Sequence, residues 1–208
     1  MKITAIEPQK KNTRRYSLFL DGEFALGIDG GILLKAGLGT GDAISQDEVD
    51  RLRTADERFR AREAAFRLLK YRQRSVAEMR GRLGEKGFQP EVVEAVIEDL
   101  LAKEYLDDTE FATLFAEDLL TRKNIGPLRL RAELNKKQVP DRIINTTIEQ
   151  MYRKYDEQDL ARQAASKKMA ILRGVDKETA YRRLTGYLAR RGFHWDVINE
   201  VIPAELSG

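Results

Sequence analysis

The sequence contains no cysteine and a single histidine, His194. The lack of cysteine excludes disulfide bonds, thiolate nucleophiles and cysteine-based zinc sites, and one histidine excludes a His–His metal pair. No apolar run approaches the ~20 residues that a membrane-spanning helix needs. Residues 1–11 lack the continuous apolar segment of a secretory signal. We therefore expect a cytoplasmic protein that does not associate with membranes.

The excess of positive charge is small. Lys and Arg number 37 and Asp and Glu number 34, which gives a net charge of +3 over 208 residues. This balance excludes a polycationic coat for nucleic acid, so any basic surface must come from the segregation of charge along the chain. Charged residues make up 34% of the sequence and apolar residues 42%. A helix-rich chain with a large solvated surface fits both numbers.

An apolar pattern occurs three times, with offsets of 51 and then 54 residues. Within each copy the spacing is i, i+3, i+4, which is typical of one face of a helix. Each copy is interpreted as three helices, and those of the first copy are expected near residues 57–71, 75–86 and 90–103. The matching positions are Met79, Leu83, Gly87 and Phe88, then Leu130, Leu134, Gln138 and Val139, and then Leu184, Leu188, Gly192 and Phe193.

Helix-capping residues occur where the expected helices begin and end. Ser75 and Glu78 have the spacing of a capping box, and Asp107 and Glu110 form a second cap signature. Gly87 stands where a left-handed C-cap is needed, a conformation that glycine adopts without steric cost. Prolines stand at expected first helical positions, where their missing N–H costs nothing: Pro90, Pro127 and Pro140.

Stacked three-helix units bury their apolar faces against each other, as in solenoid proteins. The sequence thus predicts a mainly α fold, in which three tandem three-helix repeats form an elongated, curved array after a small N-terminal region that contains a β-hairpin. The expected divisions are residues 1–55 for the N-terminal extension and 56–106, 107–155 and 156–208 for the three repeats.

The hairpin is expected around Asp21-Gly22, because Asp-Gly between apolar runs favours a tight turn. Two registers remain open. A two-residue turn pairs Phe19 with Phe24, whereas a shift by one residue gives a cleaner apolar face. The pairs in the shifted register are Leu20 with Phe24, Leu18 with Leu26, and Tyr16 with Ile28.

Two helices are expected after the hairpin. Turns at Gly30-Gly31 and within residues 37–41 flank a short helix over Ile32–Lys35. Ser45 and Glu48 then form a capping box for a helix that extends through residue 53.

Basic side chains are concentrated in part of each repeat. Residues 58–86 hold ten basic and three acidic side chains, whereas residues 91–104 hold one basic and five acidic ones. Residues 122–137 hold six basic and one acidic side chain, and residues 167–191 hold eight and two. If the repeats stack with similar orientation, these segments align into a discontinuous basic stripe that suits a polyanion or an acidic protein surface.

The sequence contains no recognisable catalytic motif. The phosphate-binding motif Gly-x-x-x-x-Gly-Lys-Ser/Thr is absent, and the glycines of residues 37–41 are interpreted as turns. His194 is interpreted as a turn or cap residue, and the acidic residues at 107–110 as helix caps rather than metal ligands. Four aromatic residues are interpreted as core: Phe88, Tyr105, Phe111 and Phe115. We expect no enzyme activity, no metal and no cofactor.

Several segments together resemble the RecX family of recombination regulators over residues 57–205. Two departures are Gln138 in place of an expected glycine, which predicts a different cap there, and Met79 in place of a more usual leucine. The resembling segments are residues 71–83, 87–88, 105–112, 126–134 and 190–198, with residues 3–6 and the hairpin similar to the extension of some members.

The resemblance implies a non-enzymatic modulator of the RecA recombinase in DNA recombination, repair and the SOS response. Family members bind the filament of RecA on single-stranded DNA, and they inhibit ATP hydrolysis, strand exchange and co-protease activity. The implied partners are the RecA filament and single-stranded DNA, contacted directly or through RecA, and the protein is expected to be a monomer.

The residues expected to contact the filament are the arginines and lysines of the basic segments. They are Arg72, Arg74, Arg80 and Arg82 in the first repeat, Arg122, Lys123, Arg129, Arg131, Lys136 and Lys137 in the second, and Arg182, Arg183, Arg190 and Arg191 in the third. Two alternatives remain open. One is a stand-alone helical nucleic-acid-binding protein, and the other is a protein–protein scaffold unrelated to recombination.

Overall fold

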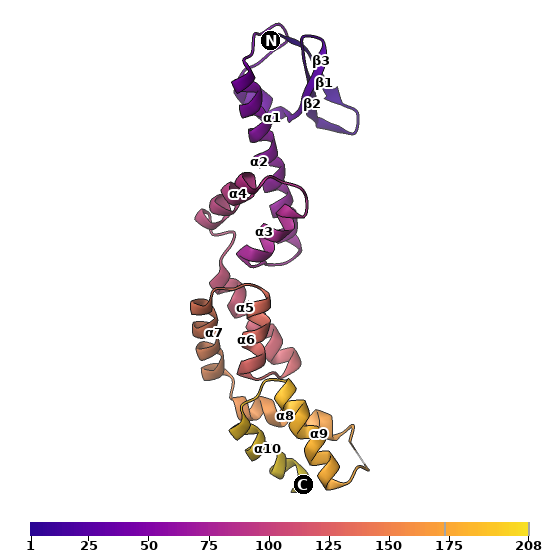
Figure 1. Cartoon of the computed structure of the whole chain (residues 1–208), viewed down its shortest axis with the longest axis vertical. Coiled ribbons are helices and arrows are strands. Elements are labelled where there is room, and N and C mark those ends of the chain that lie inside the picture. Colours follow the sequence, from indigo (N-terminus) through magenta and orange to yellow (C-terminus); the bar gives the residue numbers. More distant parts are fainter. Residues whose placement is uncertain (173, 208) are drawn as a thin grey trace. The chain divides into compact units, whose positions relative to one another are not determined.

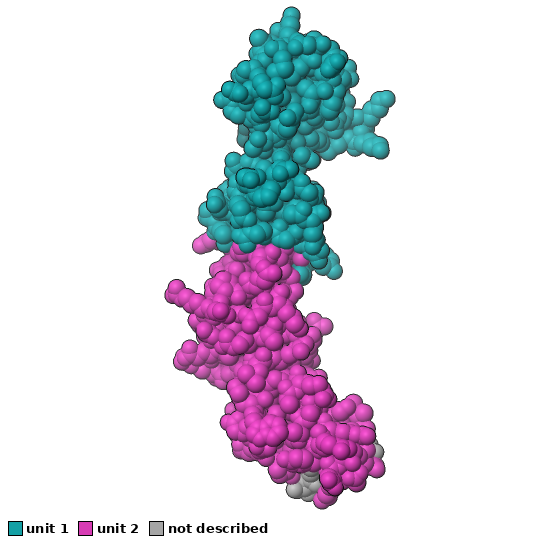
Figure 2. All heavy atoms as spheres, viewed as in Figure 1, with its two compact units in different colours: residues 1–72, 79–103 teal, residues 73–78, 104–208 magenta. Residues whose placement is uncertain are grey.

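The computed structural model describes residues 1–172 and 174–207 of the chain, with side chains through residue 204 (Figure 1). The chain forms two compact units, one of residues 1–72 and 79–103 and the other of residues 73–78 and 104–208 (Figure 2). The elements of the described residues are β1 (Ile3–Gln9), β2 (Asn12–Leu20), β3 (Glu23–Asp29), α1 (Gly30–Ala36), α2 (Gln46–Tyr71), α3 (Val76–Gly84), α4 (Pro90–Ala102), α5 (Asp108–Lys123), α6 (Pro127–Lys136), α7 (Asp141–Lys154), α8 (Glu157–Met169), α9 (Lys177–Arg190) and α10 (Trp195–Ser207).

The order of these elements confirms the predicted fold class. A small β region comes first, and three sets of three helices follow: α2–α4, α5–α7 and α8–α10. The β region is larger than the expected hairpin, because β1 pairs antiparallel with β2 and gives a three-stranded sheet in the order β1-β2-β3.

The pairing of β2 with β3 combines parts of the two registers expected from the sequence. Phe19 pairs with Phe24 beside the Asp21-Gly22 turn, as a two-residue connection requires. A β-bulge follows, and beyond it Leu18 pairs with Leu26, as in the shifted register. The predicted pairing of Leu20 with Phe24 is wrong, since Leu20 pairs with Glu23. The extra residue of the bulge lets the strand satisfy both the tight turn and the apolar face.

Helix α1 begins two residues earlier than expected, so the prediction of a turn at Gly30-Gly31 is wrong. Oδ1 of Asp29 accepts a hydrogen bond from the N–H of Gly31 at 2.9 Å and caps the helix. Gly37 ends the helix in the left-handed conformation, with φ of 66°.

Helix α2 is one continuous helix of 26 residues, so the expected break between residues 53 and 57 is wrong. Ser45 and Glu48 form the predicted capping box: the N–H of Glu48 donates to Ser45 Oγ, and the N–H of Ser45 donates to Glu48 Oε2 at 2.8 Å. No glycine or proline interrupts residues 46–71, so nothing in the local chemistry ends the helix early. The expected division at residue 55 therefore falls inside a helix.

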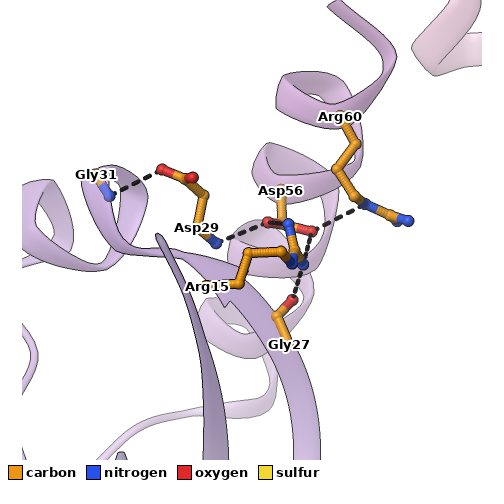
Figure 3. A network of polar contacts seen from close by, with 6 residues as sticks. All are labelled: Arg15, Gly27, Asp29, Gly31, Asp56 and Arg60. Atoms are coloured by element: carbon orange, nitrogen blue, oxygen red, sulfur yellow. Dashed lines mark hydrogen bonds and ion pairs between the residues drawn. The ribbon is translucent and has the colours of Figure 1, made fainter. Parts of the chain in front are cut away.

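A buried carboxylate attaches the sheet to α2 (Figure 3). Asp56 is only 3% exposed, and its two oxygens accept hydrogen bonds from the Arg15 guanidinium at 2.9 and 2.8 Å. The N–H of Asp29 donates to the same carboxylate at 2.9 Å, and Arg60 lies 3.1 Å away. Arg15 also donates to the carbonyl of Gly27 at 2.8 Å. These bonds satisfy the charge of Asp56 away from water and join β2, β3 and α2.

The repeats share one backbone feature after the second helix of each. Gly87, Gln138 and Gly192 occupy matching positions, and all three adopt positive φ angles, of 82°, 53° and 80°. The expectation that Gln138 caps its helix differently is therefore wrong. The second repeat keeps the left-handed turn without glycine, although this conformation is unfavourable for a residue with a Cβ.

The helix caps largely follow the sequence prediction. Asp107 Oδ1 accepts from the N–H of Thr109 at 2.6 Å and caps α5, and Ser75 Oγ accepts from the N–H of Glu78 at 3.1 Å before α3. Pro140 is the N-cap of α7 rather than its first helical residue, a difference of one position.

The second and third repeats share one hydrophobic core. Buried side chains from α5 to α10 form a single cluster, in which Leu130 and Leu184 are fully buried at matching positions. Phe111 belongs to this core, and Phe115 packs against it. Tyr105 is 53% exposed, so the interpretation of Tyr105 as a core residue is wrong.

The second and third repeats also meet through backbone contacts between two glycine-containing turns. The N–H of Gly126 donates to the carbonyl of Arg191 at 2.9 Å, and the N–H of Leu128 donates to the carbonyl of Gly192 at 3.1 Å. A Cβ atom on Gly126 would lie 2.3 Å from the Gly192 oxygen. The start of α6 therefore fits against the turn after α9 only because both residues lack a side chain.

A matching contact occurs one repeat earlier in the sequence, within the second compact unit. Ser75 Oγ donates to the carbonyl of Lys137 at 2.7 Å, and Nζ of Lys137 lies 2.7 Å from the Glu78 carboxylate. The start of α3 thus contacts the turn after α6, as the start of α6 contacts the turn after α9.

Candidate functional site

The fourteen basic residues expected to contact a partner lie on or beside the second helix of each repeat. Four lie on α3 or in the segment between α2 and α3, six at the end of α5, on α6 or at its C-cap, and four on α9 or at its C-cap. The surroundings of these side chains differ strongly from repeat to repeat.

The exposed arginines of α3 are paired with carboxylates. Arg80 donates Nε and Nη2 hydrogen bonds to the two oxygens of Glu94, at 2.6 and 2.9 Å, and this contact lowers the pKa of the Glu94 carboxyl. Arg82 lies 2.7 Å from Glu85. Arg72 is exposed at the C-cap of α2, whereas Arg74 is 8% exposed, which does not suit direct contact with a large partner.

Most basic residues of the second repeat also have acidic neighbours. Arg122 pairs with Asp118 at 3.1 Å, and Arg129 and Lys136 lie 2.5 and 3.4 Å from Glu133. Lys137 pairs with Glu78, as described above.

Two further residues of this repeat lack such a neighbour. Arg131 donates to the amide oxygen of Asn145 at 2.6 Å, and Lys123 is exposed at the end of α5. Neither forms an ion pair with a carboxylate in the described part of the chain.

The third repeat carries the least compensated positive charge. Arg182, Arg183 and Arg190 are exposed on α9, and none of them pairs with a carboxylate of residues 1–172 or 174–204. Arg191 is half-buried, donates to the carbonyl of Asn124 at 3.2 Å and lies over the Tyr187 ring at 4.7 Å. Exposed ion pairs contribute little stability, but each carboxylate reduces the local positive potential. We therefore expect α9 to attract an anionic partner most strongly.

Two basic residues near α9 were not among the predicted contact residues. Lys167 and Lys168 lie in the last turn of α8, and Lys168 Nζ is 5.6 Å from the centre of the Tyr187 ring. The charge count of residues 167–191 already included both lysines. Their proximity to α9 depends on the packing of α8 against it, which the sequence pattern does not specify.

Other polar side chains act as structural contacts. The N–H and ring Nδ1 of His194 lie 2.8 and 2.9 Å from Glu157, at the start of α10. Tyr152 donates to the carbonyl of Ile125 at 2.8 Å, and burial raises the pKa of its phenol. In the described residues, no group of three acidic or histidine side chains is placed to hold a metal ion. No described helix has the length and apolar character needed to cross a bilayer.

Four family models match successive parts of the chain. They are described as the regulatory protein RecX N-terminal domain over residues 1–45 and the first, second and third three-helix domains of RecX over residues 61–100, 107–148 and 155–202. These matches do not define where each domain begins and ends, so the limits expected from the sequence, at residues 55, 106 and 155, stay predictions.

Several curated relatives match nearly the whole chain, each named regulatory protein RecX. The Bacillus velezensis protein is 32% identical over 204 residues, covering 96% of this chain and 76% of the relative. The Bacillus subtilis protein is 31% identical, covering 95% and 74%. A Clostridium botulinum protein is 28% identical, covering 99% and 97%.

Solved structures share the fold. A crystal structure of regulatory protein RecX matches with a TM-score of 0.75 over 98% of both chains, at 24% identity. The structure of RecX from Lactobacillus salivarius matches with a TM-score of 0.65 over 74% of this chain and 98% of that one, at 20% identity. The four family models in chain order and the relatives above 30% identity show that the chain belongs to the RecX family.

Proposed function

We propose that this protein binds the filament of RecA on single-stranded DNA and inhibits its ATP hydrolysis, strand exchange and co-protease activity. It does so by binding alone, without catalysing a reaction. Membership of a family of regulatory proteins supports a regulatory role. The RecA filament as target rests on the resemblance of the chain to recombination regulators. The proposal places the protein in the cytoplasm as a monomer.

The observation that carries the proposal is the exposed, uncompensated charge of α9. Arg182, Arg183 and Arg190 find no carboxylate in the part of the chain that the structure describes. Arginine suits such a role because its planar guanidinium binds carboxylates and phosphates through paired hydrogen bonds. A RecA filament on DNA offers both kinds of anion.

The tandem repeats support binding to a repeating target. Each repeat carries basic residues on its second helix, so successive repeats can bind successive sites. After the first contact, each later contact is intramolecular and adds affinity at a high effective concentration. Modest individual contacts therefore suffice for tight binding.

The test is single-strand-dependent ATP hydrolysis by RecA, with this protein titrated from well below equimolar amounts. A parallel titration follows a labelled single strand without RecA. We expect inhibition at substoichiometric levels and weaker binding to the naked strand. Hydrolysis that stays unchanged up to a molar excess of this protein contradicts the proposal.

A second candidate function is a stand-alone helical nucleic-acid-binding protein. It is favoured by the exposed arginines of α9 and by the further lysines of α8 beside them. This alternative predicts tight binding to DNA without RecA, which weakens steeply with salt. Tight, salt-dependent binding with no effect on RecA would favour it.

A further inference from the structure

A group of positive side chains surrounds Asn124 and Tyr187 at the junction of the second and third repeats. Its cations are Lys167, Lys168 and Arg191, and we name these three with Asn124 and Tyr187 the junction cluster. The cations come from α8 and from the end of α9, whereas Asn124 is the C-cap of α5.

Asn124 fixes two of the cations. It is 3% exposed, and its side-chain oxygen accepts a hydrogen bond from Lys167 Nζ at 2.8 Å. Its carbonyl accepts from Arg191 Nη1 at 3.2 Å, and its Nδ2 donates to Gln163 Oε1 at 2.8 Å. Gln163 and Lys167 hold the side-chain amide of Asn124, and Arg191 bonds its main-chain carbonyl. Both cations are therefore fixed by hydrogen bonds to one buried residue.

The Tyr187 ring brings in the third cation. The guanidinium carbon of Arg191 lies 4.7 Å from the ring centre, and Lys168 Nζ lies 5.6 Å from it. Cations at these distances are attracted to the face of an aromatic ring. The Tyr187 ring therefore holds Lys168 and Arg191 close to each other without adding a negative charge.

Comparison with the preceding junction shows that the positive charge is not a general feature of the fold. Glu78 and Lys137 form an ion pair of 2.7 Å there. When the repeats are aligned by their offsets of 51 and 54 residues, Arg129 matches Glu78, and Arg191 matches Lys137. An acid–base pair between the two elements at one junction thus corresponds to two arginines at the next, where Arg129 pairs with Glu133 of its own helix and Arg191 pairs with no carboxylate that the structure describes.

The cluster contains no compensating carboxylate. None of its three cations forms an ion pair with an acidic residue that the structure describes, and Arg191 Nε is buried without a hydrogen-bond partner among the described residues. The negative ends of the α5, α8 and α9 helix dipoles compensate part of the charge. A bound anion would compensate the remainder.

We propose that the junction cluster binds a backbone phosphate of single-stranded nucleic acid; this proposal rests on the proposed function. Along α9, Arg183 lies one helical turn before Tyr187 and on the same face, so the positive surface continues from the cluster. A row of cations with no acid between them fits consecutive phosphates of one strand better than a single carboxylate of a protein.

The test compares two double variants of the full chain. K167Q/K168Q removes two charges of the cluster, and the new amide at position 167 can still donate a hydrogen bond to Asn124. R153Q/K154Q is the matched control, because Arg153 pairs with Glu149 and Lys154 pairs with Glu117. Fluorescence anisotropy of a labelled oligothymidylate is measured at several salt concentrations, with RecA absent, and circular dichroism checks the fold.

We expect K167Q/K168Q to weaken binding roughly fivefold at about 0.1 M salt and to reduce the slope of log affinity against log salt by about 0.7, the change that one lost phosphate contact produces. The control is expected to change affinity less than about twofold, because its charges are already paired. Wild-type protein that does not bind the strand, or a slope that both double variants leave unchanged, overturns the proposal.

Inhibition of RecA by the same variants separates this proposal from the proposed function. If K167Q/K168Q loses inhibition but binds the strand as the wild type does, the cluster contacts protein and the proposal is overturned. If the cluster governs strand binding but wild-type protein leaves RecA hydrolysis unchanged, the phosphate site stands and the proposed function fails.

Discussion

The backbones of Gly126 and Gly192 approach so closely that neither residue has room for a side chain. A Cβ on Gly126 would lie 2.3 Å from the Gly192 oxygen, and a Cβ on Gly192 would lie 2.1 Å from the Arg129 nitrogen. This contact joins the start of α6 to the turn after α9, and it lies beside the shared core of the second and third repeats.

We expect Gly126→Ala to destabilise the protein by about 3 kcal/mol, because the added methyl group must push two backbone segments apart. Gly81→Ala is the control. It lies in α3 with no heavy atom within 4 Å of the added Cβ, and alanine there is expected to stabilise by about 0.5–1 kcal/mol. Urea unfolding followed by circular dichroism measures both. Equal stabilities of the two variants would contradict the close contact.

Asp56→Ala is expected to destabilise the protein by about 3–5 kcal/mol, because it leaves the Arg15 guanidinium without its carboxylate in a largely buried position. Asp50→Ala removes an exposed ion pair with Arg53 and is expected to cost less than about 1 kcal/mol. Thermal unfolding of the two variants provides the comparison. A small effect of Asp56→Ala would mean that the network contributes little to holding the sheet on α2.

Gln138→Gly is expected to stabilise the protein by about 1 kcal/mol, because glycine relieves the cost of a positive φ of 53°. The opposite change at a matching position, Gly87→Ala, is expected to destabilise by a similar amount, since its φ is 82°. Urea midpoints of both variants test whether the left-handed turn is common to the repeats. A destabilised Gln138→Gly variant would show that the glutamine side chain contributes more than the turn costs.

Charge reversal on α9, by R182E/R183E/R190E, is expected to raise the concentration for half-inhibition of RecA hydrolysis about tenfold or more, equivalent to about 1.4 kcal/mol. All three side chains are exposed, so helical content should not change. R80E/R82E on α3 is expected to have a smaller effect, because those arginines are already paired. If reversals in all three repeats leave inhibition intact, the basic segments do not bind the filament.

The local features of this fold could be predicted from the sequence. The capping residues Ser45, Ser75 and Asp107 act within three residues of themselves, and the repeat spacing places Leu130 and Leu184 in the core. These features depend on contacts close in sequence or on helical periodicity, both of which a single sequence records.

Features that depend on contacts distant in sequence were missed. Asp56 gave no sign that it would accept hydrogen bonds from Arg15, 41 residues away. The number of charges in each segment also does not indicate that Arg80 pairs with Glu94, 14 residues away. A count of charges cannot distinguish a paired arginine from an uncompensated one, so it could not favour α9 over α3.

The attachment of the sheet to α2 also has a consequence for synthesis on the ribosome. Arg15 is translated 41 residues before Asp56, which at about 5–20 residues per second is a delay of roughly 2–8 seconds. During this delay, the nascent sheet cannot bury Arg15 against its counter-charge. The first 29 residues can therefore complete this network only after the first half of α2 has been synthesised.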